Sequence, residues 1–157
     1  MERLHYLGYI IDQHGVHVDL AKNQVIHDWP APKTLTELRS FLGLANFYSR
    51  FVLGFSHIAW VLSQINRGGG KAKFAWGQSQ QQAFNDLKQR LCSTPVLSLP
   101  DLQHPFEIKT DASNYVVGVV LTQHDHPVAY HSETLSHFFH KYPTYDKEIY
   151  SIVQACR

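Results

Sequence analysis

Apolar and polar positions recur with two different periods along the chain, and the pattern predicts a mixed α+β architecture. Near the start, apolar residues on both sides of Gln13-His14-Gly15 predict a β-hairpin over residues 4–18. Asp19 follows at the position of an N-cap, so a short helix is expected next. That helix should end at Trp29-Pro30-Ala31-Pro32, because proline lacks the amide donor that a helix needs.

Three more helices are predicted before the period changes. Thr34 and Glu37 have the spacing of a capping box, and apolar residues at near-helical spacing follow them. Ser56 is expected to cap a third helix, and Ser79 is expected to open a fourth. The glycine-rich run at 67–71 between these two helices indicates a linker.

From Pro105 onward the apolar period shortens to two, which is typical of strands. Residues 106–110 alternate, residues 116–121 form a β-branched run expected to be buried on both faces, and a third strand should start at Val128. A last helix should open at Thr144. Its apolar side holds Ile149, Ile152, Val153 and Cys156. Because this helix runs to Arg157 without a glycine cap, we expect a fragment cut inside an element.

Composition narrows the class of protein. The 157 residues carry 14 basic and 13 acidic side chains and a formal charge of +1, which excludes a polycationic arm but permits a local basic stripe. No apolar run reaches the length of a membrane span and no signal-peptide core follows Met1, so an intracellular protein with no membrane partner is expected. Two cysteines cannot build a disulfide framework, which fits a reducing compartment.

Two carboxylates are the main candidates for chemistry. Glu148 falls on the apolar side of the last helix, one turn before Ile152, where a buried charge would need a cation or several donors. It equally fits the edge of that side, reaching solvent. Asp111 ends the first strand after Pro105; there it suits an ordinary turn or an oxygen-ligand site for Mg²⁺. Strand alternation places it with Glu107 and Lys109, which does not indicate burial.

Other motifs are weaker indications of a functional site. The chain has 11 histidines, but no Cys pair or acidic ligand accompanies His124-x-His126, His131 or His137-x-x-His140 at a zinc-type spacing, so solvated loop histidines are favoured over a metal site. No Gly-x-Ser-x-Gly elbow supports serine hydrolysis. Residues 46–51 combine aromatics with Arg50, which suits either core packing beside a surface arginine or contact with a nucleic-acid backbone.

Several sequence blocks together resemble the polyprotein of gypsy-type LTR retrotransposons. These are Tyr6-Leu7-Gly8-Tyr9-Ile10-Ile11, Gly15-Val16, Trp29-Pro30-Ala31-Pro32-Lys33-Thr34, Leu38 through Tyr48, Phe74-x-Trp76, Ala83-Phe84-x-x-Leu87-Lys88, Pro95-Val96-Leu97, Thr110-Asp111-Ala112-Ser113, Pro127-Val128-Ala129-Tyr130 and Glu148. The blocks cover nearly the whole chain in order. The resemblance implies that residues 1–18 end a reverse transcriptase palm, 19–70 form a helical thumb, 71–104 form a connecting segment, and 105–157 begin a truncated RNase H-like domain of three strands and one helix.

The resemblance also implies roles for individual residues. Asp111 and Glu148 match a catalytic, metal-binding pair, in an enzyme that copies RNA into DNA and cleaves the RNA strand of RNA–DNA hybrids with two Mg²⁺ ions. Lys33, Arg39 and Arg50 are candidate contacts to hybrid or primer–template, and the remainder of the Pol polyprotein is the expected protein partner.

The chain departs from the family pattern at a few positions. Family members often have arginine where Ser49 stands, proline where Val61 stands, an acidic residue where Lys109 stands, and acidic residues in place of the glutamines after Trp76. These changes are compatible with a decayed copy. The alternative function is therefore a non-catalytic remnant that binds nucleic acid or protein. In either case two carboxylates are too few for a two-metal site, so the fragment alone is expected to have little nuclease activity.

Overall fold

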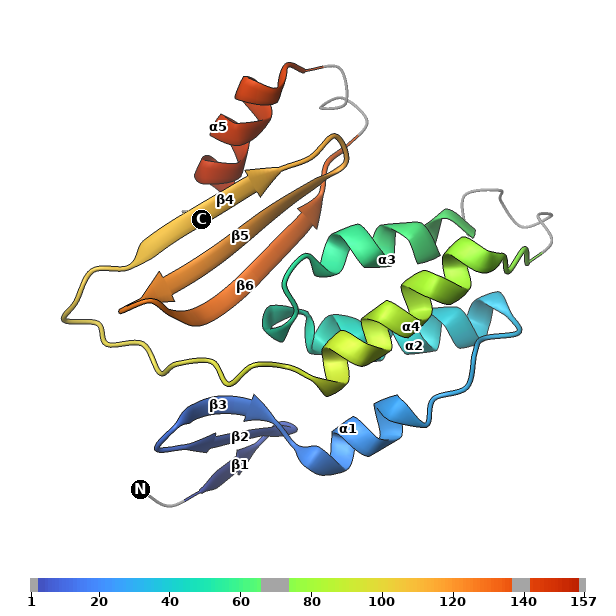
Figure 1. Ribbon diagram of the computed structural model, residues 1–157, viewed down its shortest axis with the longest axis horizontal. Helices are drawn as coiled ribbons and strands as arrows, with labels where there is room; N and C mark the ends of the chain where they lie inside the picture. Colours follow the sequence, from blue (N-terminus) through green and yellow to red (C-terminus); the bar gives the residue numbers. More distant parts are fainter. Residues whose placement is uncertain (1–2, 66–73, 137–141, 156–157) are drawn as a thin grey trace.

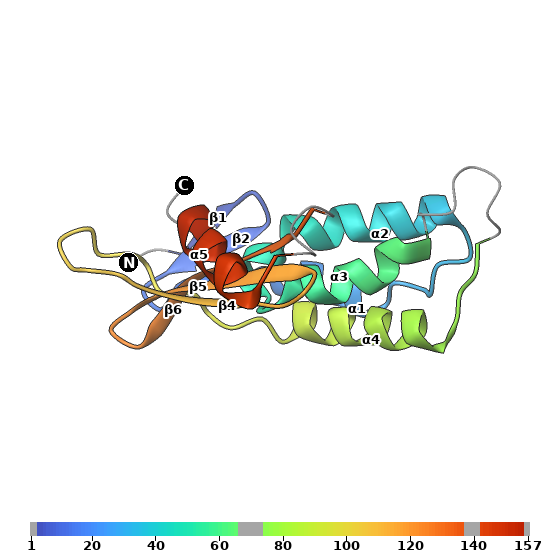
Figure 2. The same ribbon diagram turned by 90° about the horizontal axis from the view of Figure 1, so that it is seen from above.

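The computed structural model describes residues 3–65, 74–136 and 142–155, which form two three-stranded sheets and five α-helices (Figure 1). The elements in chain order are β1 (Leu4–Tyr6), β2 (Tyr9–Asp12), β3 (Gly15–Val18), α1 (Leu20–His27), α2 (Leu35–Phe47), the 3₁₀ turn η1 (Ser49–Phe51), α3 (Phe55–Ser63), α4 (Gln78–Cys92), β4 (Glu107–Ala112), β5 (Val116–Gln123), β6 (His126–Thr134) and α5 (Thr144–Ala155). The molecule is elongated, with α1–α4 toward one end and β4–β6 with α5 toward the other (Figure 2). No helix in the described ranges is long and apolar enough to cross a membrane.

The N-terminal segment folds as two hairpins rather than the single hairpin that the pattern predicts. The predicted turn before Gly15 is present, but the first apolar run is split at Leu7-Gly8, where both residues have positive φ angles of 48° and 83°. Positive φ at both central residues is typical of the tight two-residue turn that matches strand twist. Leucine rarely adopts this conformation, so the first turn carries no usual sequence signal.

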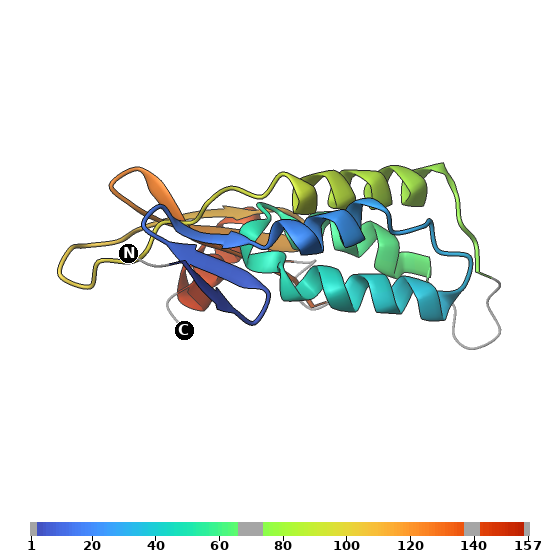
Figure 3. The same cartoon turned by 90° about the horizontal axis from the view of Figure 1, so that it is seen from below.

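This small sheet packs beneath the segment that joins α4 to β4 (Figure 3). Val16 and Leu97 exchange two backbone hydrogen bonds, each 2.8 Å long. Gly15 is required here, because a Cβ at this position would collide with the carbonyl group of Leu97.

The helices α1–α4 enclose the larger of two hydrophobic cores. The predicted N-caps of the first two helices are confirmed: the Asp19 carboxylate accepts from Ala21 N at 3.0 Å, and the Thr34 hydroxyl accepts from Glu37 N at 3.2 Å. The side chains buried in this core come from all four helices and from the segment after α4; they include Ile26, Leu38, Phe41, Leu62, Phe84, Leu87, Leu91 and Leu97. The segment predicted to connect thumb and sheet, which contains α4, therefore packs with α1–α3.

The cap predicted for the third helix is wrong, and the fourth helix begins one residue before the predicted position. α3 begins at Phe55 after Gly54, whose φ of +68° breaks the chain direction, and no side chain caps this helix. Ser56 instead donates its hydroxyl to Ser132 O at 2.8 Å and its amide to Ser132 Oγ at 2.9 Å. α4 begins at Gln78, one residue earlier than expected, with Gly77 as its N-cap.

The three strands predicted after Pro105 are present and form the second sheet, in the order β4-β5-β6 and all antiparallel. Its β5–β6 turn uses His124 and Asp125, both with positive φ. The side chain of Gln123 is buried and fastens the preceding loop to the sheet: Gln123 Oε1 accepts from Asp101 N, and Gln123 Nε2 donates to Asp101 O, both at 2.8 Å.

The packing face of α5 differs from the prediction. Ile149, Ile152 and Val153, expected to face the core, are between 43% and 51% exposed, whereas Lys147 and Ser151 on the opposite side are buried. Cys156, the fourth residue of the expected stripe, lies outside the described residues. One side of α5 is apolar, but the helix packs against the sheet with its other side. The period of the apolar residues does not show which side faces the sheet.

Candidate nuclease and nucleic-acid sites

The two candidate carboxylates lie on neighbouring elements and are both exposed. Asp111 is the fifth residue of β4, where it pairs with Gly118 of β5. Glu148 is on the first half of α5, which lies along β4 (Figure 1). The hypothesis that Glu148 reaches solvent is confirmed, because its side chain is exposed.

Strand register places Asp111 on the face of the sheet opposite α5. Tyr150 and Ala155 of α5 pack against Val117 and Val119, and these two valines share a row with Ala112 and Thr110 of β4. Asp111 belongs to the other row, because side chains alternate along a strand. The position that sequence alternation predicts for Asp111, beside Glu107 and Lys109, is therefore confirmed.

β4 is an edge strand of the described sheet, and the row that holds Asp111 lies on the face opposite the helix that holds Glu148. An ion shared by the two carboxylates would have to lie at this edge. Carboxylate oxygens suit Mg²⁺, but no group of three or more potential His, Cys, Asp or Glu ligands is present in the described ranges. The donor set thus fits part of a divalent-metal site and does not complete one.

Lys147 is a residue near this edge that the sequence reasoning missed. Its side chain is only 3% exposed, and Lys147 Nζ donates to Asn114 Oδ1 at 3.1 Å in the turn that follows β4. This contact fixes the start of α5 to the end of the strand that carries Asp111. A lysine next to the candidate glutamate looks like an ordinary surface residue in the sequence, so only its burial reveals this role.

The three candidate nucleic-acid contacts are exposed and spread from the segment before α2 to η1. Lys33 precedes α2, Arg39 lies in its second turn, and Arg50 lies in η1 after its end. The structure does not bring them into one cluster. Arg50 lines a cleft of about 620 Å³ between η1, the segment after α4, and β6, with Asn46, Ser49 and His131 on its walls.

The aromatic residues around Arg50 are mostly structural. Tyr48 and Phe51 are buried, as the packing hypothesis for residues 46–51 requires. Phe47 is 45% exposed and stacks on Tyr9 at a ring-centroid distance of 5.2 Å and an interplanar angle of 9°. Burial raises the pKa of the Tyr9 phenol, and the nearby Arg50 partly opposes this rise.

Comparison with known proteins supports the resemblance seen in the sequence. Residues 76–157 match the family described as the RNase H-like domain found in reverse transcriptase. The match begins before the expected boundary at residue 105 and takes in α4. Two Drosophila melanogaster proteins, the retrovirus-related Pol polyproteins from transposons opus and gypsy, are each 34% identical over 96% and 98% of the chain. The chain spans 16% of the length of each polyprotein.

Solved structures show the same fold. The foamy viral protease-reverse transcriptase in complex with double-stranded DNA superposes with a TM-score of 0.87 at 24% identity, covering 99% of this chain and 33% of that protein. The same viral protein in complex with an RNA/DNA hybrid gives the same score and identity over 98% of this chain and 21% of that one. By its family match, the chain belongs to the family of RNase H-like domains found in reverse transcriptase, and it is similar to one part of the Pol polyproteins of the opus and gypsy transposons.

Proposed function

We propose that this chain is the part of a reverse transcriptase/RNase H that grips an RNA–DNA hybrid and supplies two carboxylates to its nuclease site. Residues 1–18 would end the palm, 19–70 form the thumb, 71–104 connect, and 105–157 begin the RNase H domain. The complete polyprotein would synthesise DNA on RNA and hydrolyse the RNA strand of the hybrid. The observation that carries the nuclease proposal is the exposure of Asp111 and Glu148 on two elements that pack together. Because Asp111 lies on the face opposite α5, the proposal requires a shared ion to reach both carboxylates around the edge of β4.

RNase H-like enzymes generally use divalent metal ions. Such ions activate a water molecule and stabilise the leaving oxygen in phosphodiester hydrolysis. Asp111 and Glu148 would hold Mg²⁺ through carboxylate oxygens, and the Lys147–Asn114 hydrogen bond would position the helix that carries Glu148. Two carboxylates leave two metal ions short of ligands, so the chain by itself should cleave a hybrid weakly or not at all.

Metal binding can be tested without activity. Mn²⁺ added to the ¹⁵N-labelled chain should broaden the amide signals of residues near Asp111 and Glu148, since a paramagnetic ion relaxes nearby nuclei. The combined Asp111→Asn and Glu148→Gln variant should lose this broadening, while Glu133→Gln, an exposed carboxylate on β6, should retain it. Broadening that persists in the double variant would remove both residues from the metal site.

The nuclease expectation is tested with a labelled RNA–DNA hybrid and Mg²⁺. The chain should leave the RNA strand largely intact. Robust cleavage that Asp111→Asn abolishes would show that the two carboxylates suffice and would contradict the proposal that further ligands are needed.

Hybrid binding is proposed to depend on Lys33, Arg39 and Arg50. All three are exposed cations on or beside α2 and η1, and Arg50 lines a cleft that contains no acidic side chain among its lining residues. A plot of log affinity against log salt concentration has a negative slope. Each phosphate contact that is lost should make this slope shallower by about 0.9. Fluorescence anisotropy on Lys33→Gln, Arg39→Gln and Arg50→Gln measures these slopes, with Lys109→Gln on β4 as the control.

The same titration separates this proposal from the non-catalytic alternative. Salt-sensitive binding that depends on the three cations, together with loss of Mn²⁺ broadening in the carboxylate variant, supports a nuclease fragment. Binding with no metal response at Asp111 and Glu148 supports a remnant that only binds. Slopes that none of the three substitutions changes would contradict the binding surface.

A further inference from the structure

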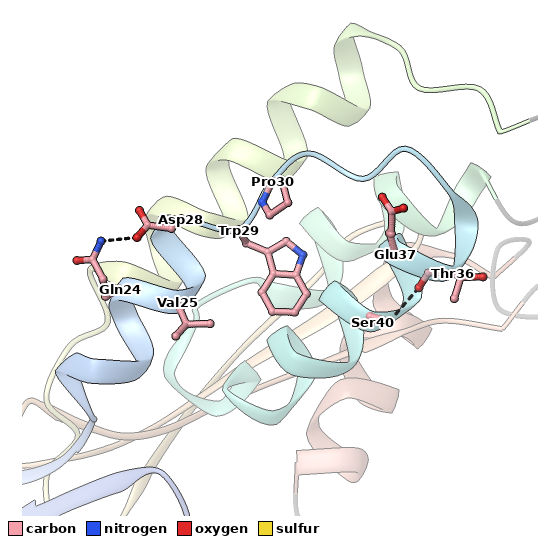
Figure 4. A pocket seen from close by; sticks show the side chains of 8 residues that line it. All are labelled: Gln24, Val25, Asp28, Trp29, Pro30, Thr36, Glu37 and Ser40. Carbon is pink, nitrogen blue, oxygen red and sulfur yellow. Dashed lines mark hydrogen bonds between the residues drawn. The ribbon is translucent and has the colours of Figure 1, made fainter.

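A second concave site lies away from the carboxylate pair, between the end of α1 and the start of α2. It has a volume of about 630 Å³ and is open to solvent. Its apolar surface comes from Val25, Trp29 and Pro30, with the Trp29 indole between the two helices (Figure 4). Val25 is 52% exposed, an unusual state for a valine on a helix that packs in a core. We call this site the Trp29 groove.

Only acidic side chains bring formal charge to the lining of the Trp29 groove. Asp28 contributes from α1 and Glu37 from α2, and the other polar lining residues are neutral: Gln24, Thr36 and Ser40. A hydrogen bond from Gln24, and a second from His27, lower the pKa of Asp28, so this carboxyl group is ionised at neutral pH. The groove therefore combines an aromatic surface with negative charge.

The groups that line the groove are held in place by the protein. Lys88 Nζ donates to the backbone carbonyl of Trp29 at 2.7 Å, and the Trp29 ring packs against Phe41 with centroids 6.0 Å apart. Gln24 Nε2 donates to Asp28 Oδ2 at 2.7 Å, and the amide of Lys33 donates to Glu37 Oε2 at 2.8 Å. A ligand would find the ring and both carboxylates already ordered, which lowers the entropic cost of binding.

A guanidinium group matches this combination better than other common groups. It is planar and cationic, stacks on indole rings, and pairs with carboxylates through several donors. The volume exceeds what one guanidinium needs, and the exposed Val25 and Pro30 leave room for an apolar neighbour. We propose that the Trp29 groove binds an arginine-bearing, partly apolar peptide segment of a partner protein. The guanidinium would stack on Trp29, with negative charge supplied by Asp28 on one side of the ring and Glu37 on the other (Figure 4).

This assignment distinguishes the groove from the cleft at Arg50, while Lys33 and Arg39 lie close in sequence to the groove residues Thr36, Glu37 and Ser40. The acidic groove repels phosphate, so it should not bind the hybrid, whereas the cleft at Arg50 lacks acidic lining residues. A peptide held in the groove would leave Arg50 accessible. The proposal is independent of the nuclease site and stands whether or not Asp111 and Glu148 bind metal.

The test uses a fluorescein-labelled peptide with one arginine between two leucines, and the same peptide with neutral citrulline in place of arginine. Anisotropy measures affinity for the full chain, and ¹⁵N chemical shifts locate the site. We expect millimolar or tighter binding, shifts at Val25, Trp29 and Glu37, and at least about fivefold weaker binding of the citrulline peptide.

The variants are chosen to preserve shape. Asp28→Asn combined with Glu37→Gln should weaken binding of the arginine peptide by about fivefold, because the negative charge on both sides of the groove is lost. Asp86→Asn, which removes an exposed carboxylate on α4 outside the groove, should have no effect. Circular dichroism establishes that each variant is folded.

Four results would overturn the proposal. They are no binding at millimolar peptide, equal affinity for the citrulline peptide, unchanged affinity in the double carboxylate variant, and shifts centred on another surface. A labelled RNA–DNA hybrid is titrated in parallel. If the hybrid rather than the peptide shifts the groove residues, the groove is part of a nucleic-acid surface and the peptide assignment is wrong.

Discussion

At the residue scale, two glycines show that the backbone angle and the space around a residue affect stability independently when the residue is substituted. Gly43 lies inside α2, and a Cβ built on it would meet no atom within 4 Å. Gly54 also has open space around a Cβ, but its φ is +68°, in the left-handed region that disfavours other residues. The same substitution should therefore have opposite effects at the two positions.

Gly43→Ala should raise the free energy of unfolding by about 0.5–1 kcal/mol, because alanine loses less backbone entropy in a helix. Gly54→Ala should lower it by about 1 kcal/mol or more, because alanine is strained at positive φ. Urea titration followed by circular dichroism measures both. If Gly43→Ala destabilised the chain, the open space around this position would be contradicted.

A second residue-scale prediction concerns Asp12. Its carboxylate accepts from the amide of His14 at 2.9 Å and contacts His17 Nε2 at 3.1 Å across the β2–β3 hairpin. The hydrogen bond from the His14 amide, followed by the contact with His17, lowers the pKa of Asp12 below its ordinary 3.8. The folded state thus favours the ionised form. This contribution to stability is present above pH ~4 and is lost as pH falls through the lowered pKa.

Asp12→Asn should therefore destabilise the chain at pH 7, and its deficit relative to the wild type should shrink as the pH is lowered toward 3. Urea midpoints at several pH values measure this difference. Glu133→Gln, at an exposed position on β6, serves as the matched control and should show no such convergence. A stability difference between the wild type and Asp12→Asn that stays constant with pH would mean that the introduced amide group, and not the lost charge, destabilises the variant.

At the element scale, sequence predicted most of the strands and helices, because their signals are local. Proline runs, the Asp19 and Thr34 caps and the change of period at Pro105 act within a few residues of the chain. The predictions that failed concern residues whose contacts are made with a segment distant in the sequence. Ser56 carries the chemistry of an N-cap, yet its hydroxyl bonds Ser132, 76 positions away. No local pattern contains that contact.

The candidate sites likewise combine features that the local sequence predicts with features that depend on packing between distant elements. The apolar and polar pattern made Asp111 and Glu148 candidates, but it fitted ordinary surface roles equally well. The family resemblance is what favoured a catalytic role for both. The face of β4 that holds Asp111 followed from alternation. Burial of Lys147 and the Trp29 groove did not, because both depend on how α5 and α1 pack against other elements. The exposed apolar side of α5 could not be told from a core-facing side by its period.

At the scale of the whole molecule, the helical region and the second sheet share an interface made from several kinds of contact. Ser56 donates two hydrogen bonds to Ser132, and Trp60 stacks on Tyr115 with ring centroids 5.0 Å apart. Ser98 N donates to Pro127 O at 2.8 Å on the segment after α4. These contacts tie α3 and the connecting segment to the sheet, so we expect the two regions to unfold together.

Loss of the serine pair should weaken this coupling measurably. Ser56→Ala combined with Ser132→Ala should lower the free energy of unfolding by about 2 kcal/mol, since each removes one partly buried hydrogen bond worth about 1 kcal/mol. Ser40→Ala is the control, because that hydroxyl donates to Thr36 O within α2 and a surface change there should cost less than about 0.5 kcal/mol.

Amide signal intensities at Leu87 and Val119 follow the helical region and the second sheet, respectively, through a urea titration. Coincident loss in the wild type supports one cooperative unit, because a shared interface makes each region's stability depend on the other. Separate transitions in the wild type would mean that the serine bonds and the aromatic stack join two independently folding parts.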